Sequence, residues 1–295
     1  MKNLKFILFI AICCIFSSCE DVIKVSLDEG TSQLTVDGWI TDQAGVQNIR
    51  LTKTKPYFDN SAANPAKNVS VKIADNDGMI YDFTDPDGDG NYTWTPKNNE
   101  KLGKVGKTYT LTINFEGETY QASSKLNRVP VIDSVGYKFQ EKTIFFQKEG
   151  YLAEFYATDL KGIGDCYRVK YYRNGKLMNR PIDLQAGLGY DGVGNAGSNS
   201  DATLFFLPLR QAVNQFDSLY QTGETVKVEL YSITEDAFNF FTEVVTQINN
   251  GGLFATPIAN VRTNIKNTNP NGKKATGYFG ASAVSTAQTT IQKRK

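Results

Sequence analysis

The sequence predicts an all-β protein of two β-sandwich domains, with one amphipathic helix packed on the second. From Gln33 onward, apolar and polar residues alternate in short runs, which is typical of half-buried antiparallel strands. Turn-forming residues separate these runs at short intervals, as they do in β-sandwiches. Residues 235–249 have instead the apolar spacing of an amphipathic helix.

Residues 33–128 are predicted to form the first sandwich, of immunoglobulin-like or fibronectin-like type. Their alternating runs give about seven strands, a number that suits such a sandwich. Asn76-Asp77-Gly78 and Glu116-Gly117-Glu118 supply residues that tolerate positive φ where hairpins reverse. The expected apolar strand positions are Leu34, Val36, Ile40, Ile49, Leu51, Val69, Val71, Ile73, Met79, Tyr81, Phe83, Tyr92, Trp94, Tyr109, Leu111, Ile113, Phe115, Tyr120 and Ala122.

Residues 129–295 are predicted to form the second sandwich, joined to the first by a short stiff segment at Pro130. Asn174-Gly175 predicts a tight hairpin between two of its strands. Thr234 can cap the helix over residues 235–249, which has one wide apolar face. We expect that face to pack across the sandwich, and a membrane-surface helix is the alternative. The last strand is expected between Ala275 and Ile291.

Residues 1–18 have the pattern of a secretory signal peptide. Their apolar run from Phe6 to Phe16 is too short to cross a hydrocarbon core of about 30 Å. Ser17-Ser18-Cys19 resembles a bacterial lipobox, which implies that Cys19 is lipidated and becomes the first mature residue. Residues 19–32 are then expected to be a lipidated tether, held at a membrane by lipid attached to Cys19.

The composition excludes several classes of function. The 295 residues include no histidine, so histidine-dependent catalytic triads and histidine metal sites are excluded. The formal net charge is +1 without clustered basic residues, which argues against nucleic acid as a partner. Cys166 lies in a strand-like alternation, and this predicts a buried thiol. We therefore expect a protein that is not an enzyme and that has no cofactor other than calcium.

Asp85, Asp87 and Asp89 are the candidate calcium ligands. Carboxylates at alternate positions within a glycine-containing loop can converge on this ion. The glutamate that would complete an EF-hand is replaced by Pro96, so the loop is not an EF-hand. An Asp/Gly hairpin turn without a bound ion is the alternative, and the sequence favours it.

Several stretches of the chain resemble the domain-of-unknown-function 4249 family, and the resemblance covers essentially the whole chain. They include Val36-Asp37-Gly38-Trp39-Ile40, Pro130-Val131-Ile132-Asp133, Gly251-Gly252-Leu253-Phe254 and Gly277-Tyr278-Phe279-Gly280. The resemblance implies an outer-membrane lipoprotein of Bacteroidetes-type bacteria, in a family commonly encoded beside TonB-dependent receptors. Glu20-Asp21 after Cys19 resembles a surface-export signal of those bacteria, which implies exposure at the cell surface. The family supplies no catalytic residues.

Two functions remain open at this stage. The first is a non-catalytic binding or accessory partner of a TonB-dependent receptor in nutrient capture or uptake. The second is a carboxylate-dependent surface hydrolase that acts on glycans. The lack of histidine favours the first. Because aromatic residues anchor interfaces, we expect partner or ligand contacts at Tyr190, Phe254, Tyr278 and Phe279; burial of the closing aromatic residues in the core is the alternative.

Overall fold

The computed structural model describes residues 30–56, 59, 61–98, 100–192, 201–250 and 261–293. The predicted signal peptide over residues 1–18, the predicted lipidation site Cys19 and the predicted contact residue Phe254 lie outside these described residues. The described residues from Ser32 onward form one compact unit of strands, and among them there is a single longer helix, so the predicted all-β class is confirmed.

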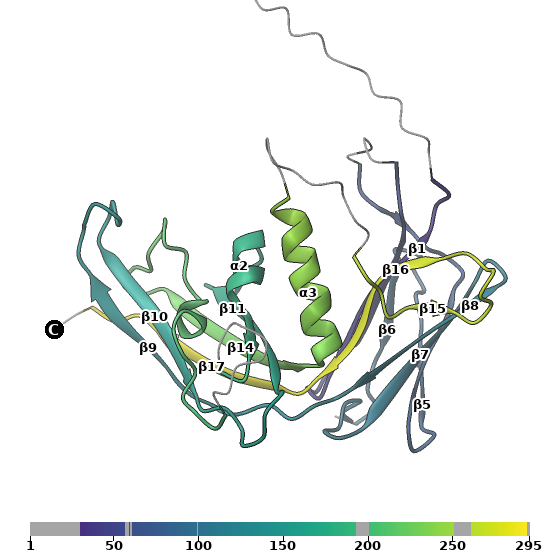
Figure 1. The fold of residues 1–295 in the computed structure, drawn as a ribbon, viewed down its shortest axis with the longest axis horizontal. Coiled ribbons are helices and arrows are strands. Elements are labelled where there is room, and N and C mark those ends of the chain that lie inside the picture. The colour runs from purple at the N-terminus through teal and green to yellow at the C-terminus, as the bar shows by residue number, and fades with distance from the viewer. Residues whose placement is uncertain are drawn as a thin grey trace, which may run out of the picture. The chain divides into compact units, whose positions relative to one another are not determined.

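Two sheets make up the first sandwich, and both are mainly antiparallel (Figure 1). One sheet has the order β16-β1-β2-β3, with β6 also paired to β2; the other has the order β15-β8-β7-β4-β5. The strands of the first sheet are β1 (Leu34–Thr41), β2 (Gln47–Lys53), β3 (Asn64–Pro65), β6 (Asn91–Trp94) and β16 (Ala275–Ser282). Those of the second are β4 (Ser70–Asp75), β5 (Ile80–Phe83), β7 (Thr108–Phe115), β8 (Glu118–Lys125) and β15 (Lys266–Asn267).

The first core lies between these two sheets. Alternate residues of each strand point inward, so β7 buries Tyr109, Leu111 and Ile113 and exposes the residues between them to varying degrees. The predicted hairpins also form: Gly78, Glu116 and Gly117 have positive φ at the reversals. Met79 differs from the prediction, because it lies in the connection between β4 and β5 and is 59 % exposed.

The end of the chain returns to the first sandwich. β16 pairs in parallel with β1, from Leu34 opposite Ala275 to Thr41 opposite Ser282. β15 pairs with β8. The sequence predicts a single last strand of the second sandwich between Ala275 and Ile291, and this prediction is wrong for residues 275–282. An alternating pattern identifies a strand without identifying its partner. Gly277 permits the close pairing: it has a φ of +89°, and a Cβ there would collide with the Val36 carbonyl oxygen.

The second sandwich is built from a two-stranded and a five-stranded sheet. The smaller sheet pairs β9 (Ile132–Gln140) with β10 (Gly150–Ala157). The larger has the order β12-β11-β14-β17, with β13 also paired to β11. Its strands are β11 (Cys166–Arg173), β12 (Lys176–Met178), β13 (Leu188–Tyr190), β14 (Thr225–Ile233) and β17 (Val284–Thr290). The predicted Asn174-Gly175 turn joins β11 to β12, with both residues at positive φ.

The predicted helix over residues 235–249 is α3 (Glu235–Ile248), and the Thr234 Oγ1 caps it by accepting the Ala237 N–H at 3.2 Å. Its buried face includes Phe238 and Phe241, which belong to one apolar cluster with Cys166 of β11 and Ile233 of β14. Trp39 and Tyr278 of the first sandwich join the same apolar cluster. Among the described residues, two short helical segments lack a sequence signal because each has fewer than two turns: α2 (Pro181–Ala186) and η1 (Leu209–Gln211).

Candidate functional site

A cavity among the described residues opens between two loops of the second sandwich. It has a volume of about 950 Å³. One wall is the loop from β9 to β10 and the other is the segment before β14, with Arg173 at the end of β11. The lining residues are Lys142, Phe145, Phe146, Gln147, Lys148, Glu149, Arg173, Phe216, Asp217, Ser218, Leu219 and Gln221.

Large apolar side chains project into solvent around this cavity. Ile144 is 90 % exposed, Phe145 is 83 % exposed and Phe216 is 52 % exposed. We call these three residues the hairpin surface. Single exposed apolar residues are ordinary, whereas a group of them around a cavity is typical of a binding site.

Local hydrogen bonds shape the loop that carries Ile144 and Phe145. The Thr143 Oγ1 accepts the N–H groups of Phe145 at 3.2 Å and Phe146 at 3.1 Å. The Thr143 N–H donates in turn to the Phe146 carbonyl oxygen at 2.8 Å. The backbone polar groups are therefore satisfied within the turn, and Phe145 is directed outward.

Arg173 fixes the opposite wall. Its guanidinium donates to the Ser218 carbonyl oxygen at 2.6 Å, to the Leu219 carbonyl oxygen at 3.1 Å and to Glu224 at 2.8 Å. The hydrogen bond to Glu224 raises the pKa of Arg173, although burial opposes the shift. The segment that presents Phe216 is thus tied to β11 by a charged group with several partners.

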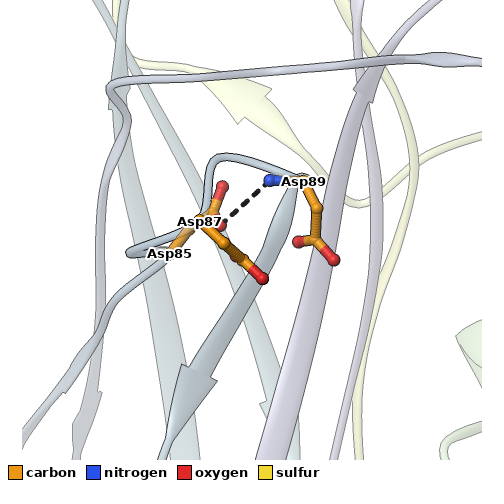
Figure 2. A group of neighbouring side chains, drawn as sticks. All are labelled: Asp85, Asp87 and Asp89. Carbon is orange, nitrogen blue, oxygen red and sulfur yellow. Dashed lines mark hydrogen bonds between the residues drawn. The ribbon is translucent and has the colours of Figure 1, made fainter.

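The predicted calcium ligands Asp85, Asp87 and Asp89 do come together, with ligand oxygens within 4.8 Å of one another (Figure 2). Both Asp85 oxygens are engaged, since Oδ1 accepts the N–H groups of Gly88 at 2.9 Å and Asp89 at 3.2 Å, and Oδ2 accepts that of Gly90 at 3.0 Å.

Asp89 is engaged as well. Its carboxylate accepts the side-chain amide and the backbone N–H of Asn91, each at 2.8 Å, and these bonds lower the pKa of Asp89. Two of the three carboxylates therefore act as acceptors for the turn backbone, as expected for the Asp/Gly hairpin.

The predicted aromatic contacts are mostly buried. Phe279 is 0 % exposed in the first core and Tyr278 is 6 % exposed against Trp39 and Phe240, so neither ring is available to a partner. Their positions agree with the alternative that the closing aromatic residues belong to the core. Tyr190 is half-buried on β13, with its ring edge on Phe238 at a centroid distance of 5.8 Å. The hairpin surface was missed because isolated apolar residues in a loop carry no periodic signal.

A second acidic cluster, not predicted from the sequence, lies beside Cys166. Asp159 and Asp191 are 3 % and 0 % exposed. Burial raises the pKa of Asp159 to about 6, although the hydrogen bond that the Tyr167 hydroxyl donates to it at 2.6 Å opposes this shift.

Burial also raises the pKa of Cys166 to about 12, so its thiol is protonated and buried, in line with the sequence prediction.

The model of the family described as "Domain of unknown function (DUF4249)" matches residues 20–288. The chain belongs to this family. Because the match spans both sandwiches and the returning strand β16, the DUF4249 unit is the whole two-sandwich fold. A comparison with curated proteins gave no match. Among the described helices, none combines the length and apolar character that a membrane crossing requires.

Proposed function

We propose that this member of the DUF4249 family is an exported, lipid-anchored protein that docks on a TonB-dependent outer-membrane receptor and assists nutrient capture without catalysis. The observation that carries the proposal is the hairpin surface, Ile144, Phe145 and Phe216, around a cavity of about 950 Å³. Lipidation at Cys19 and surface exposure are further parts of the proposal, supported by the lipobox-like sequence.

The hairpin surface has the composition of a protein interface. Aromatic side chains contribute a large share of binding energy when a partner covers them. Around them stand charged residues of both signs, with Lys142 and Lys148 beside the exposed Glu149. An apolar centre within a polar rim is the usual anatomy of a specific interface.

The two walls of the cavity also favour docking over catalysis. Arg173, the partly buried cation of the site, is held by Glu224 and by two backbone carbonyl groups. Its role in the structure is to fix a loop, and its hydrogen-bonding groups face the protein. The remaining charged residues of the cavity, Lys142, Lys148, Glu149 and Asp217, are exposed and suit a wet interface better than a catalytic centre.

Photocrosslinking from single positions tests the proposal. A benzophenone amino acid replaces Phe145 or Phe216, and the matched control replaces Ile80, which is 57 % exposed on the first sandwich. After irradiation of intact cells, positions 145 and 216 should form a covalent adduct of the size of an outer-membrane receptor, and position 80 should not.

Affinity capture of the receptor by this protein, from detergent-solubilised outer membranes, gives an independent readout. The double variant Phe145→Asp and Phe216→Asp should recover at least tenfold less receptor than the parent protein, since charges would enter the apolar centre of the interface. A receptor that is absent from the parent sample, or recovered equally by the variant, contradicts the proposal. Release of sugars from surface glycans by the purified protein would favour the hydrolase instead.

A further inference from the structure

Two buried carboxylate oxygens in the second sandwich lack a hydrogen-bond partner among the described residues. They are Oδ2 of Asp159 and Oδ2 of Asp191. Both side chains are more than nine-tenths buried, at 3 % and 0 % exposed. A buried carboxylate oxygen without a partner loses the solvation that water would give it, unless a counter-charge replaces the water.

The other oxygen of each carboxylate is firmly held. The Tyr167 hydroxyl donates to Asp159 Oδ1 at 2.6 Å. Asp191 Oδ1 accepts the backbone N–H groups of Gly164 at 2.7 Å and Asp165 at 2.8 Å. These bonds fix the orientation of both carboxylates and leave one oxygen of each unused, which is how outer-shell partners orient the ligands of a metal ion.

The two carboxylates belong to neighbouring stretches of chain. The Asp191 N–H donates to the Asp165 carbonyl oxygen at 2.8 Å, next to the pairing of β11 with β13. A Cβ built on Gly192 would lie 3.6 Å from the Cβ of Asp159. Gly192 also has a φ of +75°, so the backbone turns at this point and brings residue 191 beside residue 159.

The neighbourhood has an excess of negative charge. Two further carboxylates lie nearby: Asp165 accepts the Arg128 guanidinium at 2.6 Å, and Asp201 accepts the Gly162 N–H at 2.7 Å. Arg128 thus forms an ion pair with Asp165, and it also donates to the Lys161 carbonyl oxygen at 2.7 Å. Within the described chain, no lysine or arginine forms an ion pair with Asp159 or Asp191.

We propose that Asp159 and Asp191 ligate a hard divalent cation of the calcium class through their free Oδ2 atoms. Calcium takes oxygen ligands in flexible number, so two carboxylates can be completed by carbonyl groups or water. The site is distinct from Asp85, Asp87 and Asp89, where backbone N–H groups already occupy both oxygens of Asp85. Exported proteins meet free calcium at concentrations where sites of about 10⁻⁴–10⁻³ M affinity are filled.

Calcium chloride is the probe for this site, added to the full-length protein after dialysis against chelator. The melting temperature should rise with calcium, because an ion that binds only the folded state stabilises it by mass action. Asp159→Asn and Asp191→Asn should each weaken the apparent affinity at least tenfold. Asp87→Asn is the matched control with the same chemical change, and it should retain the parent response.

Terbium luminescence separates binding at this site from binding elsewhere. Terbium occupies calcium sites and emits when a nearby tyrosine is excited, and Tyr167 lies against Asp159. Tyr167→Phe should lower the sensitised emission several-fold, and calcium should displace terbium from the parent protein. Terbium luminescence of the parent protein and of Tyr167→Phe therefore tests binding at this site even if Asp159→Asn does not fold.

Three results would overturn the assignment. The first is a melting temperature of the parent protein that calcium leaves unchanged; a proton shared by the two carboxylates would then replace the ion. The second is a calcium response that survives both Asp159→Asn and Asp191→Asn. The third is a calcium response that Asp87→Asn alone abolishes, which would place the ion in the loop of Asp85, Asp87 and Asp89.

Discussion

The indole ring of Trp39 lies 5.6 Å from the ring of Phe241 between centroids, and this contact joins β1 of the first sandwich to α3 of the second. The Trp39 Nε1 donates to the Ser282 Oγ at 2.8 Å, so the ring is fixed on the side of β16 as well. Three elements far apart in the sequence therefore meet at one side chain, and α3 is packed by both sandwiches.

Replacing Trp39 should destabilise the whole unit. Trp39→Ala removes the ring contacts with Phe241 and Tyr278 and leaves a space that the strands cannot close, so we expect a loss of about 3 kcal/mol in the free energy of unfolding. Met79→Ala, at a position 59 % exposed, should change stability by less than about 0.5 kcal/mol. Urea unfolding followed by circular dichroism measures both; equal effects would contradict the role given to Trp39.

A side chain at Gly277 should break the pairing of β16 with β1. Gly277→Ala combines a φ of +89° with a collision against the Val36 carbonyl oxygen, so we expect at least about 3 kcal/mol of destabilisation. Gly223 has a φ of +91° with open space around its Cβ direction, so Gly223→Ala should cost only about 1 kcal/mol. Comparing the two by thermal unfolding separates the collision from the backbone strain, and similar losses would argue against the tight parallel pair.

Lys170 should make stability rise with pH between about 8 and 10. Burial, with a smaller effect from the neighbouring Arg168, lowers the pKa of Lys170 to about 8, although Glu229 and Asp37 oppose this shift. The unfolded chain keeps a lysine pKa near 10.4, so it binds more protons than the folded chain in this interval, and stability increases as pH rises. Two groups with raised pKa values act in the opposite direction: Cys166 from about pH 8.5 and Tyr231 above about pH 10. The contribution of Lys170 is therefore measured as a difference between the parent protein and a Lys170 variant.

The variant Lys170→Met tests this pH dependence. It should be more stable than the parent protein at pH 7.5 by about 1 kcal/mol, and the difference should shrink toward pH 9.5. Urea midpoints at three pH values give the comparison. Parallel stability profiles for the two proteins would show that Lys170 titrates as an ordinary solvated amine.

The proposed lipid anchor can be tested by replacing Cys19, because transfer of the lipid requires its thiol. Cys19→Ala should abolish palmitate incorporation and leave the protein soluble or unprocessed. Cys166→Ala is the matched control and should be labelled normally, because that thiol is 2 % exposed in the folded protein. Labelling that persists in the Cys19 variant would remove the lipid anchor from the proposed function.

Local sequence patterns predicted local structure, but they did not predict contacts between segments that are distant in the sequence. Asn174-Gly175 fixes its own hairpin through positive φ, and Thr234 caps its own helix, so both were predictable from a few adjacent residues. The partner of β16 depends on residues 241 positions away, such as Leu34 opposite Ala275, and no periodicity records that choice. The same holds for Asp159 and Asp191, which the fold brings together from separate loops.

The loop of Asp85 offers a last test, because its carboxylate has a structural role that requires no ion. Asp85→Ala leaves the N–H groups of Gly88, Asp89 and Gly90 without their acceptor, so we expect a loss of about 1–2 kcal/mol in calcium-free buffer. Asp87→Ala removes an exposed carboxylate that accepts none of these bonds and should be close to neutral. Chemical unfolding in chelator compares them. If Asp85→Ala were neutral in chelator and destabilising only with calcium present, the carboxylate would be a metal ligand and the hairpin interpretation would have to be abandoned.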